Sequence, residues 1–292
     1  MSIASARLRR LTHIRWGIYL LLAAAVIVPY FAPIQMKFQP GESVVRLYRQ
    51  VDALPRGSHV LISLDYDPGG AAELSPMGKV MVEHCFRNGL VPVVMTHWIS
   101  GLGISDALTR EAAADAHKWW GKELLPGRDY VYLGYRPGQS NLVLNMGENL
   151  KVAFDKDYEG RPTRDMAALA GVNSLKDFAM ILEVTAGTPG AEMWIMYGTD
   201  RLKIPLGVGS TAVMVPDLIP FLQAGQMVGM LGGLRGAADY ETLLDLPKAA
   251  RREATLGMVS QSAAHTLVIL LILGANAGVV LRRLWRRRRG AA

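Results

Sequence analysis

The sequence predicts an α/β domain, a doubly wound and mostly parallel sheet of about five strands, flanked by N- and C-terminal transmembrane helices. Two observations support this prediction. Each end of the 292-residue chain has a long uncharged apolar run beside a cluster of arginines. Between these ends, apolar runs of strand length alternate with patterns of helical spacing, which is typical of βαβ units.

The composition excludes several classes of protein. Half of the residues are hydrophobic, a fifth are charged, and the mean hydropathy is positive at +0.18. A disordered chain has the opposite balance, with low hydrophobicity and high charge. Cys85 is the single cysteine, so an intramolecular disulfide and a cysteine-based zinc site are both excluded.

The N-terminal part reads as a membrane anchor. Residues 1–15 are basic, and residues 16–36 form an uncharged run of 21 residues. A helix needs about 20 apolar residues to cross the hydrocarbon of a bilayer. A cleaved signal peptide is the alternative, but no Ala-x-Ala site follows the run, and Pro29 and Pro33 lie at its end instead.

A second span is predicted over residues 256–281, followed by an arginine-rich tail over 282–292. Gly274 and Gly278 lie four residues apart in this span, with Asn276 between them. Small residues at that spacing let two helix backbones approach closely, and asparagine can hydrogen-bond across the contact. We therefore expect a packing partner, either the first span or a membrane helix of another chain, including a second copy.

The arginines predict the orientation. Four precede the first span and six follow the second, and cytoplasmic flanks collect basic residues. We expect a protein of the cell (inner) membrane with both termini cytoplasmic and residues 38–250 as an extracytoplasmic domain. Without those ten arginines, 22 basic residues face 25 acidic ones, so the central part carries −3. This charge argues against a nucleic-acid partner, and the expected partners are the lipid bilayer and other proteins.

Strands and helices are predicted in alternation along the domain. Apolar runs of strand length occupy residues 59–65, 90–96, 130–133, 180–185 and 202–208. Helical patterns occupy 40–54, 76–88, 105–119, 142–154, 188–197, 216–224 and 234–245. Residues 155–178 are rich in loop signals. Gly229–Glu241 contains four glycines, which suit either close packing on the sheet or a contact surface for a partner.

Polar and glycine residues follow the ends of the predicted strands. In an open α/β sheet, ligands bind beyond the carboxyl ends of the strands. The residues placed there are Asp65, Asp67, Gly69, Gly70, Thr96, His97, Arg136, Thr185, Thr188, Ser210 and Thr211. They predict a ligand-binding rim, although glycine and threonine also serve as ordinary turn and cap residues.

Asp65-Tyr-Asp67 resembles the first motif of haloacid-dehalogenase-type phosphohydrolases, and Thr96 resembles their second motif. The resemblance implies Mg²⁺ as cofactor, Asp65 as nucleophile and Asp67 as general acid. The chain departs from the family after the predicted strand 180–185, where the family has a pair of acids and this sequence offers only Glu183. No lysine motif of that family stands out either.

Two stretches resemble an uncharacterised family of bacterial proteins with one membrane span at each end. One comprises Asp65–Pro68 with Glu73–Met77 and His84–Gly89, and the other is Gly225–Glu241. The resemblance covers most of the central domain and implies no activity. The layout is also similar to that of gliding- and transport-associated proteins, whose extracytoplasmic domain has an amidotransferase-like fold without the catalytic triad.

The sequence favours a non-enzymatic role without a cofactor, as a subunit or scaffold of an envelope membrane complex. The reasons are two anchors, a glycine-rich segment and the lack of a complete catalytic constellation. Two alternatives stay open. One is a Mg²⁺-dependent phosphohydrolase that uses Asp65 and Asp67, and the other is a ligand-binding sensor that uses the strand-end rim.

Overall fold

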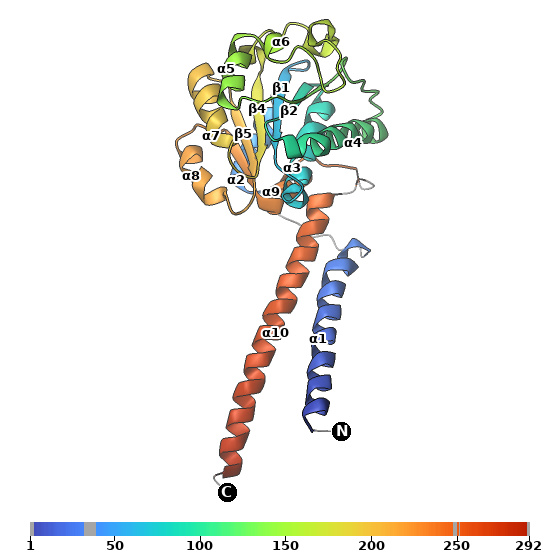
Figure 1. Cartoon of the computed structure of the whole chain (residues 1–292), viewed down its shortest axis with the longest axis vertical. Helices are drawn as coiled ribbons and strands as arrows, with labels where there is room; N and C mark the ends of the chain where they lie inside the picture. The colour runs from blue at the N-terminus through green and yellow to red at the C-terminus, as the bar shows by residue number, and fades with distance from the viewer. Residues whose placement is uncertain (1–2, 32–38, 248–249, 251, 291–292) are drawn as a thin grey trace. The chain divides into compact units, whose positions relative to one another are not determined.

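The computed structural model describes residues 3–31, 39–247, 250 and 252–290 (Figure 1). The chain divides into two compact units. Phe38–Thr255 form one unit, and Met1–Lys37 with Leu256–Ala292 form the other.

Each end of the described chain carries a long apolar helix. Helix α1 covers Ile3–Ile27 and continues as the 3₁₀ turn η1, Val28–Tyr30, while α10 covers Glu253–Gly290. Both are long and apolar enough to cross a membrane. Helix α10 contains all of the predicted span 256–281. The predicted span 16–36 is described only to residue 31, and its last five residues lie outside the described part.

The predicted parallel α/β sheet is confirmed. Six strands pair in the order β3-β2-β1-β4-β5-β6, and every pair is parallel. They are β1 His59–Asp65, β2 Val91–Thr96, β3 Val131–Tyr135, β4 Met180–Thr185, β5 Leu206–Ser210 and β6 Gly229–Gly232. The sequence did not predict β6, because it has only four residues and two are glycine. This is the Rossmann-like order, and it reverses between β1 and β4.

Helices cover both faces of the sheet (Figure 1). One face packs against α2 Glu42–Asp52, α3 Ala71–Asn88, α4 Leu102–Trp120 and α9 Gly233–Leu243. The other packs against α5 Ser140–Glu148, α6 Leu150–Ala153, α7 Ala191–Trp194 with the π-helical turn Ile195–Asp200, and α8 Val215–Gln223. The segment 155–178 contains three short 3₁₀ turns, as its loop signals predict.

Glycines in the last two strands allow α2 to lie close to the sheet. A Cβ at Gly229 would collide with the carbonyl oxygen of Ser43, and one at Gly207 would collide with the side chain of Leu47. Within Gly229–Glu241, Gly236 likewise lies against the backbone of Leu231. The glycines of this segment therefore serve close packing in the fold.

Two predicted helices differ from the structure. The helix expected from residue 76 begins at Ala71, since the turn Pro68–Gly70 already starts it, and Pro76 lies inside. The helix expected over 142–154 is divided at Asn149, whose backbone is extended. The Asn149 side chain accepts the N–H of Val152 at 3.1 Å and so begins a second helix.

Helix α9 holds both ends of the α/β unit. Asp239 accepts the N–H of Gly41 at 3.2 Å near the start of the unit. Glu241 accepts the N–H groups of Ala254 and Thr255, both at 2.9 Å, where α10 begins. One helix therefore fixes the positions at which the chain enters and leaves the sheet domain.

Candidate functional site

The carboxylate of Asp65 organises the carboxyl edge of the sheet. Asp65 ends β1 and is fully buried. Its Oδ2 accepts the hydroxyl of Ser63 at 2.8 Å, and its Oδ1 accepts the backbone N–H of His97 at 2.5 Å. The hydroxyl of Thr96 lies 3.3 Å from the same Oδ1. These contacts join β1 to the residues that follow β2.

A second buried carboxyl lies beside this one. Glu183 of β4 pairs in register with Ser63, and the next residue on the same face, Thr185, pairs with Asp65. Both carboxyl oxygens of Glu183 are buried without a hydrogen-bond partner of good geometry. Burial and the negative charge of Asp65 raise the pKa of Glu183 well above its ordinary value. Burial and the charge of Asp65 therefore both favour the neutral form of Glu183.

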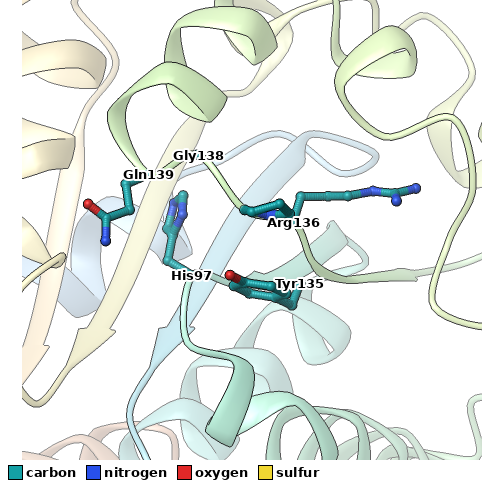
Figure 2. A pocket seen from close by; sticks show the side chains of 6 residues that line it. His97, Tyr135, Arg136, Gly138 and Gln139 are labelled. Carbon is teal, nitrogen blue, oxygen red and sulfur yellow. The ribbon is translucent and has the colours of Figure 1, made fainter.

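His97 lines a pocket of about 250 Å³ at this edge (Figure 2). Its residue is only 6 % exposed, yet neither ring nitrogen has a partner among the described residues. The ring centroid lies 5.6 Å from that of Trp194. Burial lowers the pKa of His97, while the charge of Asp65 acts in the opposite direction. The His97 imidazole is therefore neutral at neutral pH.

The opposite wall of the pocket is the loop between β3 and α5. The loop contributes Arg136, Pro137, Gly138 and Gln139 to the lining, and Tyr135 at the end of β3 adjoins them. Gly138 and Gln139 both have positive φ, 124° and 46°, and no side chain caps the first turn of α5. Figure 2 shows the His97 ring directed toward Gly138 and Gln139.

Arg136 lines the pocket, but its guanidinium contributes little positive charge there. Its guanidinium donates to Asp155 at 2.6 Å, and in Figure 2 it points away from His97. Its stem forms the wall, while its positive charge is paired with Asp155 near the ring of Phe154.

The other predicted rim residues form turns. Asp67 Oδ1 accepts the N–H of Gly70 at 3.1 Å, with Gly69 between them. Thr185 Oγ1 accepts the N–H of Gly187 at 3.2 Å, and the Trp98 indole donates to Pro189, which follows Thr188, at 3.1 Å. Ser210 is buried at the end of β5 without a partner, and Thr211 begins the next turn.

The structure thus brings together part of the predicted rim. Asp65, Thr96 and His97 converge, and Arg136 borders the same pocket through its stem. Asp67 turns instead toward the start of α3. Among the described residues, no group of three or more His, Cys, Asp or Glu side chains is placed to hold a metal ion.

Sequence reasoning missed Gln139 and the role of Glu183. The dipeptide Pro137–Gly138 is a turn signal just after a strand, and it could have marked the start of α5. Glu183 lies inside an apolar strand. Burying a carboxyl there costs free energy, so its presence could have indicated a functional position.

The chain matches no model of a known protein family, and no curated protein matches it. The layout that the sequence resemblance implies is present, with a long apolar helix at each end and a parallel sheet between them. Membership of the bacterial family stays a prediction.

Glu183→Gln is expected to flatten the pH dependence of stability. Because the folded pKa of Glu183 lies above its unfolded value near 4.5, the folded state binds more protons, so wild-type stability falls as pH rises above that value. Glutamine mimics the protonated carboxyl and removes this loss, which amounts to at most about 1.4 kcal/mol per pH unit. Thermal unfolding of the full-length protein in detergent between pH 5 and 8 measures this pH dependence of stability.

Glu123→Gln, which removes an exposed carboxyl on a loop, controls for the loss of one charge. The Tm of Glu183→Gln should exceed that of wild type increasingly toward pH 8. Parallel pH curves for wild type and Glu183→Gln would contradict a raised pKa of Glu183.

Proposed function

We propose that this protein is a membrane-anchored α/β domain that binds a small ligand at the carboxyl edge of its sheet, in the pocket beside His97. The buried His97 ring supports this proposal best. A buried polar group without a partner costs about 1–3 kcal/mol, so such groups are usually paired. A ligand that enters the pocket can supply the missing partner.

The position of the pocket supports the same function. In sheets of this topology, ligands bind outside the carboxyl ends of the strands, near the point where the strand order reverses. His97 follows β2, and its backbone N–H is bound to Asp65 at the end of β1, one of the two strands at the reversal.

Phosphohydrolysis by Asp65 and Asp67 is less well supported. A nucleophilic carboxylate must reach its substrate, but Asp65 has no exposed surface and both of its oxygens accept hydrogen bonds. The Asp67 carboxylate accepts a hydrogen bond from Gly70 at the start of α3. The proposed binding function needs neither Mg²⁺ nor another cofactor.

A small-ligand screen on the full-length protein in detergent tests the binding function. We expect at least one compound from a panel of anionic, neutral and cationic metabolites to raise the Tm. A ligand at 100 times its Kd stabilises the folded state by about 2.7 kcal/mol. His97→Phe keeps a ring beside Trp194 but removes both nitrogens, and should abolish the effect.

His117→Gln, at an exposed histidine of α4, is the matched control and should respond like wild type. If no compound raises the Tm, or if every active compound acts equally on His97→Phe, the pocket does not bind ligands and the proposal is wrong.

We further propose that both termini are cytoplasmic and that the α/β unit lies on the extracytoplasmic side of the cell membrane. The arginines at both ends support this orientation. The native Cys85 is fully buried, and burial raises the pKa of its thiol to about 12, so it stays a poor target for labelling. An introduced cysteine can therefore report its side of the membrane.

In intact cells, a membrane-impermeant maleimide should label Glu123→Cys in the α/β unit and leave Ala292→Cys unlabelled until the membrane is permeabilised. The opposite pattern would show that the domain is cytoplasmic. Wild type, with Cys85 alone, is the control for background labelling.

As a second candidate function, the protein acts as a subunit of an envelope membrane complex and contacts its partner through α10. Of the residues that the structure describes, none lies within 4 Å of a Cβ added at Gly274 or Gly278, which leaves room for another helix. Asn276 donates to the carbonyl of Ile272 in its own helix at 3.0 Å.

Gly274→Leu combined with Gly278→Leu should shift the protein to a smaller species in blue-native electrophoresis, because leucine side chains keep a partner helix away. Gly17→Leu, in the other apolar helix and also without a neighbour within 4 Å, should leave the species unchanged. A wild-type monomer in several mild detergents would contradict the subunit role.

A further inference from the structure

We infer that the pocket beside His97 recognises an oxyanion, the phosphate or carboxylate group of a small ligand, through the His97 ring and the free amides at the start of α5. This inference rests on the proposed binding function and names the class of ligand. It is carried by three features of the pocket: its free backbone donors, its buried histidine and the lack of acidic groups in its lining.

The backbone donors come from the last two residues of the loop before α5 and from the first residue of the helix. In the described chain, the N–H groups of Gly138, Gln139 and Ser140 donate to no protein group, and no side chain caps this helix. The first N–H groups of a helix have no partner within the helix, and the helix dipole places partial positive charge there. A helix start that is left open in this way can bind an oxyanion.

His97 is a second and independent feature. The residue is 94 % buried, and its ring is directed toward Gly138 and Gln139 (Figure 2). Within the part of the chain that the structure describes, both ring nitrogens lack a partner. A neutral imidazole always carries one N–H, so His97 can donate to an oxyanion at the same place as the amides. Two elements that are far apart in the sequence therefore present donors to one pocket.

The charge of the lining favours anions over cations. None of the six described residues that line the pocket carries a carboxyl group. The carboxylate of Asp65 is not part of this lining and accepts hydrogen bonds from Ser63, Thr96 and the His97 N–H. Arg136 is paired with Asp155, so the recognition depends on directed hydrogen bonds more than on a free positive charge.

Titrations of the full-length protein in detergent at constant ionic strength test the inference, with Tm and tryptophan fluorescence as readouts. The probes are sulfate, inorganic phosphate and succinate, with dimethyl sulfone and succinamide as neutral analogues of similar shape and putrescine as the cation. We expect the three anions to bind at least tenfold more tightly than their neutral analogues and putrescine to have no effect. The ratio of succinate to phosphate affinity then tells which oxyanion the pocket prefers.

Gln139→Asp separates a binding role from a structural one. An aspartate just before α5 places a negative charge beside the pocket, where it repels an anion, and a carboxylate is favourable at the positive end of the helix dipole. We therefore expect an unchanged or higher Tm together with at least tenfold weaker sulfate binding. Gln139→Asn, which adds no charge, should lose less affinity. His97→Phe should also weaken sulfate binding at least tenfold, and His117→Gln should not.

The outcomes distinguish this inference from the proposed function. If neutral compounds bind in a manner that depends on His97 while the three anions do not bind, the oxyanion inference is wrong and the binding function stands. If anions bind equally to wild type, Gln139→Asp and His97→Phe, they bind elsewhere and the inference is overturned. If no compound binds at all, both fail.

Discussion

The hydrogen-bonded carboxylate of Asp65 is the interaction on which the carboxyl edge depends. A buried charge is tolerated only when donors replace its water shell, and Asp65 has donors from β1 and from the chain that leaves β2. The backbone N–H of His97 is one of them, so the carboxylate fixes the backbone from which the His97 ring extends. The His97 ring therefore reaches the pocket because the Asp65 carboxylate fixes the His97 backbone through a hydrogen bond.

Glu183 shows that burying polar groups at the carboxyl edge of the sheet costs folding free energy. Its carboxyl is fully buried in an otherwise apolar stretch of β4, and burial together with the charge of Asp65 raises its pKa. Together with the unpartnered ring of His97 and the hydroxyl of Ser210, it concentrates unsatisfied polar atoms at one end of the sheet. Apart from Asp65, Glu183 and the hydroxyl residues Ser63 and Thr185, the buried side chains of β1 and β4 are apolar. Local departures from the packing rules are expected at functional sites, which agrees with a ligand at this edge.

The sequence predicts the sheet well because its strands are continuous apolar runs, and five of the six strands were predicted in this way. It also predicts that Asp65, Thr96 and His97 share an edge, since parallel strands end on the same side. It could not predict the pocket itself, which depends on the positive φ of Gln139 and on a helix start without a cap. These features arise from the tertiary path of one loop. The break at Asn149 is similar, because a single extended residue interrupts an otherwise helical pattern.

In this domain the helix that begins beside the pocket without a side-chain cap is α5. Dinucleotide-binding proteins with the same strand order bind their ligand at a different helix, the one that follows the first strand. Those proteins bind phosphate at the first βα turn, where glycines let the backbone approach the ligand. Here the corresponding turn, between β1 and α3, carries the Asp67 carboxylate, which accepts the Gly70 N–H and would repel a phosphate. The loop after β2 also closes on this turn, since a Cβ at Gly101 would collide with the carbonyl oxygen of Tyr66. The usual anion position is thus filled by the protein's own carboxylate, and α5 offers uncapped amides beside a buried histidine in its place.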